Sequence, residues 1–162
     1  MTHPPRFKDA LEVLARHHVE LIVVGGVAAV LGGAPIATFD LDVVHARHAR
    51  NLERLLAALA ELEATYNDQS GRRLRPELAA LAGPGHHLLI TRCGPVDVLG
   101  AIGQGRTYDD LLPESLTVDL GGVTVQVLGL AGVIRTKEEA GRDKDRAVLE
   151  ILRRTLLGST SR

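Results

Sequence analysis

The sequence predicts an α+β fold in which a small mixed β-sheet is flanked by helices, and two observations support this. Short apolar runs typical of buried strands alternate along the chain with segments in which leucine and valine recur at helical spacing. A glycine pair at 121–122 separates two further apolar runs, which is typical of a β-hairpin. Neither a repeat nor a linker interrupts the sequence, so we expect residues 1–162 to form a single domain.

The first half of the chain is expected to alternate between helix and strand. A helix over about residues 6–18 precedes a strand at 21–24, whose uninterrupted apolar run is typical of a strand buried on both faces. A short buried helix at 27–31 then leads into a second strand at 36–44. The helix at 48–64 is the clearest in the sequence because its leucines fall on one stripe.

The second half is expected to be richer in strands and to end in two helices. We expect a polar loop at 66–75, a short helix at 76–82, strands at 87–92 and 95–99, a helical turn at 109–112, hairpin strands at 116–120 and 123–128, helices at 130–140 and 144–157, and a frayed end at 158–162.

The composition excludes several classes of function. A net charge of −1 gives no overall attraction to nucleic acid or to a membrane surface, and 2% aromatic residues leave few rings on which single-stranded bases could stack. Cys93 is the single cysteine, so an internal disulfide is excluded. No apolar run is long enough for a membrane span and the N-terminus lacks the apolar core of a signal peptide, so we expect a cytoplasmic protein.

Three aspartates stand out because each is placed in an apolar run. Asp40 and Asp42 are two residues apart in the expected strand 36–44, so their side chains should point to the same face. Asp97 is the one charged residue of a later expected strand. A charge in such a run is costly without a partner or a cation, and carboxylate oxygens suit Mg²⁺ or Mn²⁺. The alternatives are a solvated strand end for the first two and an ion pair with Arg92 for the third.

Two glycines precede this strand at a position suited to phosphate. Gly25 and Gly26 lie where a strand leads into a helix, and backbone N–H groups there can bind phosphate. A turn that merely closes against the helix is the simpler alternative. The histidines lack the spacing of a zinc site, and His45, just beyond the aspartate strand, is expected to have a surface role.

These residues carry a resemblance to the nucleotidyltransferase superfamily of the DNA polymerase β type. That family has a glycine pair, a gap of about a dozen residues, a D-x-D motif and a later third acidic residue. The sequence is most similar to the small bacterial AbiEii-type toxin nucleotidyltransferases, on the segments Gly25–Val30, Thr38–Asp42, Gly94–Leu99 and Thr136–Asp145. The resemblance covers about residues 20–150 and implies the nucleotidyltransferase fold.

The resemblance also implies an activity and a set of roles. Asp40, Asp42 and Asp97 would be catalytic and would hold one or two Mg²⁺ ions, with Mn²⁺ as a substitute, while an acceptor hydroxyl attacks the α-phosphate of an NTP such as ATP. The partners would be the NTP, an acceptor (a tRNA or other RNA 3′ end, a protein or a small molecule) and either a cognate toxin or antitoxin or a second copy in a homodimer. The nucleotide-binding residues would be Gly25, Gly26, Thr38, Lys137 and Lys144.

The basic residues and the activity itself each have an alternative interpretation. Lys137 and Lys144 could belong to solvated helix faces, Thr38 could simply suit a strand, and Asp145 is expected to cap a helix or to pair with Lys144 or a nearby arginine. The alternative to an enzyme is a non-catalytic nucleotide-binding or antitoxin-like module that acts by partner contact.

Overall fold

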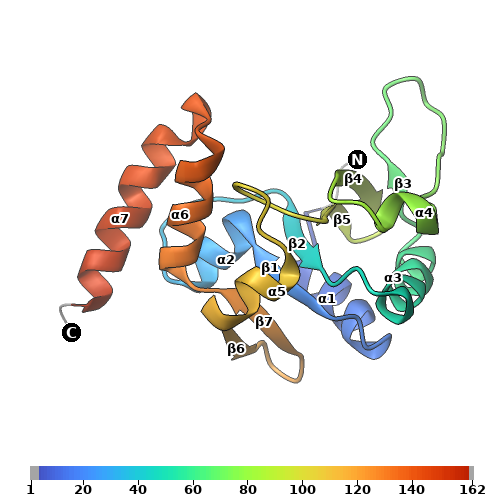
Figure 1. Ribbon diagram of the computed structural model, residues 1–162, viewed down its shortest axis with the longest axis horizontal. Coiled ribbons are helices and arrows are strands. Elements are labelled where there is room, and N and C mark those ends of the chain that lie inside the picture. Colours follow the sequence, from blue (N-terminus) through green and yellow to red (C-terminus); the bar gives the residue numbers. More distant parts are fainter. Residues whose placement is uncertain (1–3, 161–162) are drawn as a thin grey trace.

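The computed structural model describes residues 4–160 and places one seven-stranded mixed sheet at its centre (Figure 1). The strand order is β3-β4-β5-β2-β1-β7-β6, with β1 parallel to β7 and antiparallel to β2, and β2 parallel to β5. The strands are β1 (Leu21–Val24), β2 (Leu41–His45), β3 (Thr65–Tyr66), β4 (His86–Thr91), β5 (Gly94–Leu99), β6 (Ser115–Asp119) and β7 (Thr124–Leu128). The predicted α+β fold with helices flanking a mixed sheet is confirmed.

The helices gather at the two ends of this sheet and across it. Figure 1 shows α6 and α7 at one end and α3 with α4 toward the other, and α1 packs against α3. The helices are α1 (Phe7–Arg16), α2 (Gly25–Leu31), α3 (Ala49–Glu61), α4 (Leu78–Leu81), α5 (Tyr108–Leu111), α6 (Leu130–Ala140) and α7 (Arg146–Thr160), with 3₁₀ turns η1 (Leu112–Glu114) and η2 (Asp143–Asp145). None of the helices in residues 4–160 is long and apolar enough to cross a membrane.

Burial differs between the middle of the sheet and the β4 side. All four residues of β1 are buried, as its uninterrupted apolar run predicts. Strand β4 instead alternates between exposed and buried residues, so one of its faces is open. The open face carries Leu88 and Ile90, and the covered face carries Leu89.

Several boundaries differ from those predicted. Strand β2 begins at Leu41, and residues 35–40 are extended chain outside the sheet, so Asp40 precedes the strand. Helix α2 already begins at Gly25. Strand β3 was not predicted, because a two-residue strand carries no periodicity of its own. At the C-terminal end, α7 continues to Thr160, so residues 158–160 are helical, and residues 161–162 lie outside the described part.

The two faces of β4 should respond differently to the same truncation. Leu89→Ala should cost about 2–5 kcal/mol of unfolding free energy, because Leu89 is buried and its loss leaves a cavity. Leu88→Ala, which truncates a side chain that is 53% exposed, should change it by about 0.5 kcal/mol or less. Urea unfolding measures both values, and equal costs would contradict the assignment of the open face.

Candidate functional site

Strand register brings Asp42 and Asp97 side by side. Asp42 of β2 is the direct partner of Asp97 on the parallel strand β5, so the two side chains point to the same face of the sheet. Asp40 joins them from the extended segment before β2, and one carboxylate oxygen of each of the three aspartates lies within 4.8 Å of the others. The structure therefore gathers the three aspartates that the sequence singled out, although only two of them lie on strands.

The end of β1 fits closely against these carboxylates. Val24, the last residue of β1, pairs with Asp42, and the chain then turns into α2 at Gly25 with a left-handed φ of +62°. A Cβ atom at Gly25 would overlap the Asp42 carboxylate, so both the φ angle and the available space require glycine. A Cβ atom at Gly26 would likewise overlap Thr38. The glycine pair thus lets the first turn of α2 approach the acidic cluster.

Thr38 organises the segment that carries Asp40. Its hydroxyl donates a hydrogen bond to the backbone carbonyl of Asp40 at 3.2 Å, and its side chain lies against Gly26. Thr38 is not part of a strand, so the alternative that it simply suits a strand is wrong. In the structure Thr38 therefore orders the approach to Asp40, and a contact with phosphate stays a prediction.

Burial and mutual repulsion raise the pKa of these carboxyl groups. Desolvation raises the pKa of Asp42 to about 8, with further contributions from the hydrogen bond to Asp97 and from the charges of Asp97 and Asp40. Burial also raises the pKa of Asp97. The ammonium of Lys137, on the helix α6 that packs against α2, acts in the opposite direction on the pKa of Asp42. The folded chain thus holds carboxylates whose charge it does not fully compensate.

The ion pairs of the described residues leave the three aspartates without a cationic partner. Among residues 4–160 no arginine or lysine forms an ion pair with Asp40, Asp42 or Asp97. Arg92, the alternative partner for Asp97, instead contacts Glu61 at 3.9 Å. A set of hard oxygen donors with raised pKa values and no protein cation fits a divalent metal ion such as Mg²⁺.

The two lysines expected at the site differ in position. Lys137 lies on α6, is 16% exposed and sits 3.6 Å from Asp145. Lys144 is exposed on η2, and no interaction within residues 4–160 links it to the acidic cluster. Asp145 pairs with Arg142, a nearby arginine as expected, and also with Lys137, whereas pairing with Lys144 is not observed.

His45 does not have the surface role that we expected. It is fully buried on β2, three residues after Asp42 and therefore on the opposite face of the strand. Its ring Nε2 lies 2.8 Å from the carbonyl oxygen of Leu81, so it ties α4 to the sheet. Burial lowers its pKa, so it is neutral in the folded protein near neutral pH.

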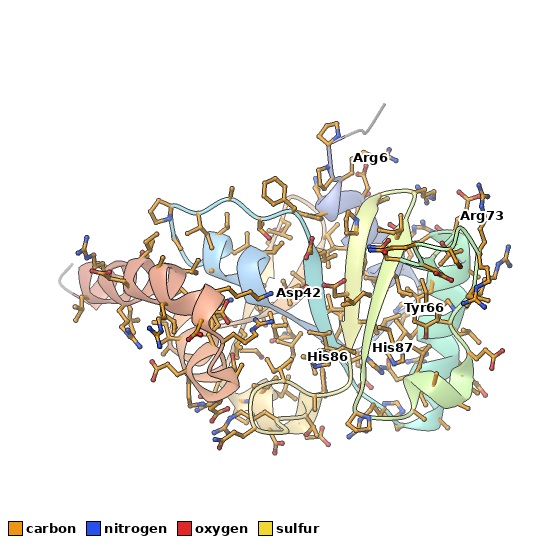
Figure 2. The ribbon with its side chains drawn as sticks, turned by 90° about the horizontal axis from the view of Figure 1, so that it is seen from above. Arg6, Asp42, Tyr66, Arg73, His86 and His87 are labelled. Carbon is orange, nitrogen blue, oxygen red and sulfur yellow. The ribbon has the colours of Figure 1, made fainter. Side chains whose placement is uncertain are left out.

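Figure 2 looks onto the strands that carry the cluster, with α1 and α3 behind them. Asp42 lies with α2 and α6 on one side and with β5 and β4 on the other, and His86 lies on the β4 side. On that side Leu88 of β4 is the register partner of Asp97. The cluster therefore has two distinct flanks: the glycine turn and Lys137 form one, and the open face of β4 forms the other.

Comparison with known proteins gives a likeness of fold to solved structures. No model of a known protein family matches the chain, and no curated protein matches it. Among solved structures, the chain is similar to a Thermotoga maritima protein described as "a putative nucleotidyltransferase (TM1012)", with a TM-score of 0.57 and 16% identity over 89% of this chain and 88% of that chain. At this identity the likeness shows the fold: the chain has a nucleotidyltransferase fold.

Removing one carboxylate should stabilise the metal-free protein in a pH-dependent way. Because the pKa of Asp42 is higher in the folded than in the unfolded chain, its ionisation destabilises the fold increasingly from about pH 4 up to about pH 8. In EDTA at pH 9, Asp42→Asn should therefore raise the melting temperature by about 2–4 °C for each kcal/mol that it adds to the free energy of unfolding. At pH 5 the rise should be much smaller.

Calorimetry of both variants at both pH values tests this. The control is Asp143→Asn, which removes a carboxylate that is 90% exposed and should change neither melting temperature. A lower melting temperature for Asp42→Asn at pH 9, or an equal gain at both pH values, would contradict the claim that ionised Asp42 destabilises the metal-free fold.

Proposed function

We propose that the protein is a Mg²⁺-dependent nucleotidyltransferase that moves an NMP from an NTP to a hydroxyl group of an acceptor. The observation that carries the proposal is the convergence of three carboxylates without a cationic partner, in the fold of a protein described as "a putative nucleotidyltransferase". Carboxylates so arranged can hold Mg²⁺ against a triphosphate. Sequence resemblance and donor chemistry support the same metal independently of the fold.

Asp40, Asp42 and Asp97 are assigned as the ligands of the metal, which would act as a Lewis acid and would balance the charge of the phosphates. The acceptor oxygen attacks the α-phosphorus, the bond from this phosphorus to the bridging oxygen of the β-phosphate breaks, and pyrophosphate leaves. Asp97, at the edge of the cluster that faces β4, is assigned to receive the acceptor proton as well.

The two flanks of the cluster suggest where each substrate binds. We assign the triphosphate to the flank of Gly25, Gly26 and Lys137, because it offers backbone N–H groups and a cation beside the carboxylates. The acceptor is assigned to the open face of β4. Thr38 acts on the first flank by ordering Asp40, and Lys144, which is exposed, contributes only if the triphosphate extends to it.

The acceptor is an RNA 3′ end, a protein or a small molecule. A role in a toxin–antitoxin pair, with a cognate partner or a homodimer, rests on the sequence resemblance alone. The β4 flank carries exposed Leu88 and Ile90, so we expect the acceptor to present some apolar surface to it.

The direct test uses α-labelled NTPs. The protein with Mg²⁺, each labelled NTP and either pooled tRNA or cell extract should produce a labelled acceptor. Asp40→Asn combined with Asp42→Asn should lower the yield by about 100-fold or more, because losing about 3 kcal/mol of transition-state stabilisation has that effect. Treatment with RNase separates an RNA acceptor from the other classes.

Asp143→Asn is the control, because it removes an exposed carboxylate and should keep wild-type activity. If the wild-type protein binds neither Mg²⁺ nor any NTP at millimolar concentration, the function is wrong. If it binds both but labels no acceptor from any extract, the non-catalytic nucleotide-binding alternative replaces it.

A further inference from the structure

Asp145 is a buried carboxylate that holds two cations. Its side chain is only 8% exposed; one oxygen accepts a hydrogen bond from Arg142 Nε at 2.9 Å, and the other lies 3.6 Å from Lys137 Nζ. A buried carboxylate is costly unless it is paired, and here each oxygen has its own cation. Because one carboxylate faces two cations, this trio keeps a net positive charge.

The helix that carries Lys137 is itself fixed by ion pairs on both sides of this residue. Arg135 donates to Glu114, with one contact at 2.6 Å, and Glu139 accepts from Arg106 at 2.8 Å and 3.0 Å. These pairs tie α6 to η1 and to the loop after β5. The backbone of Lys137 is therefore held at a fixed position. The direction of its long side chain depends on a further contact.

By pairing with the Lys137 ammonium, Asp145 keeps this side chain beside the acidic cluster. Helix α6, which carries Lys137, packs against α2, and Gly25 at the start of α2 lies against Asp42. The Lys137 ammonium accordingly acts to lower the pKa of Asp42. An ammonium group has three N–H donors. One can point at Asp145, which leaves two to point elsewhere. A lysine held in this way has lost most of its side-chain entropy before any ligand arrives.

We propose that Asp145 is a positioning residue that aims Lys137 at the triphosphate of the bound NTP, with Arg142 balancing the charge of Asp145 so that the trio stays cationic. This proposal rests on the proposed function, since it assigns a residue to the same site. It distinguishes the two lysines, because Asp145 pairs with Lys137 and not with Lys144.

The coupling between the two residues can be measured through nucleotide binding. Titration calorimetry with Mn²⁺ and the tightest-binding NTP should show about 10- to 100-fold weaker binding for Asp145→Asn, the range expected when a group that orients a ligating side chain is lost. Lys137→Met should weaken binding at least as much. Adding Asp145→Asn to Lys137→Met should cause no further loss, because Asp145 acts through Lys137.

Two control variants accompany this cycle. Glu138→Gln removes an exposed ion pair with Arg153 on the same helix, and Lys8→Met removes an exposed lysine of α1; both variants should bind the NTP as the wild type does. Circular dichroism confirms that each variant is folded. Independent, additive losses in the double variant would overturn the positioning role and would assign Asp145 to the stability of the α6–α7 junction.

A second measurement needs no variant of Asp145 that might unfold. The chain has only three lysines, Lys8, Lys137 and Lys144, so selective ¹³C,¹⁵N labelling of lysine, which leaves every ammonium N–H donor in place, gives three sets of side-chain NMR signals to follow. In the NTP-free protein the Lys137 signal should be immobilised and those of Lys8 and Lys144 mobile. Addition of Mg²⁺ and NTP should shift the Lys137 signal and leave the Lys8 signal unchanged.

The outcomes separate this proposal from the function on which it rests. If the wild type binds NTP but Lys137 is as mobile as Lys144, the positioning role is wrong and the function stands. If Lys137 is immobilised but the wild type binds no NTP at millimolar concentration, both are overturned, and the trio is a structural ion-pair network.

Discussion

The structure depends on one electrostatic constraint, the confinement of three carboxylates to a small space without a protein cation paired to any of them. Two such charges 4 Å apart repel by about 4 kcal/mol at an effective dielectric near 20. Burial is the main cause of the raised pKa values of Asp42 and Asp97, and charge repulsion within the cluster adds to it. A cation bound between them would turn the cost into an attraction, so the arrangement is compatible with a divalent metal ion.

The scaffold tolerates this strain because the elements around it are held firmly. Strand β1 is buried on both faces and pairs with β2, whose register with β5 places Asp42 next to Asp97. Left-handed Gly25 brings the α2 turn against them without a side chain in the way. Ion pairs around α6 also fix the helix that carries Lys137, whose ammonium offsets part of the charge of Asp42 without forming an ion pair with it.

Local sequence patterns predicted the strands that carry Asp42 and Asp97 and the glycine turn beside them. The apolar runs around Asp42 and Asp97 identified both strands, and the glycine pair identified the turn between β1 and α2. Features fixed by distant contacts were not predictable in this way. Asp40 leaves the strand because residues 35–40 pack near Gly26 through Thr38, and His45 is buried because α4 supplies a carbonyl 36 residues away. The pairing of Asp145 with Lys137 likewise depends on how α6 meets η2, which a charge pattern does not reveal.

The most direct test of the account is Mn²⁺ binding followed by electron paramagnetic resonance, in which only free Mn²⁺ gives the strong six-line signal. The account predicts that the wild-type protein depletes this signal at submillimolar Mn²⁺, and that Asp97→Asn weakens binding at least about tenfold. Asp143→Asn, which changes an exposed carboxylate, should bind Mn²⁺ as the wild type does. A wild-type protein that leaves the free Mn²⁺ signal unchanged at millimolar concentration would contradict the claim that these three carboxylates form a metal site.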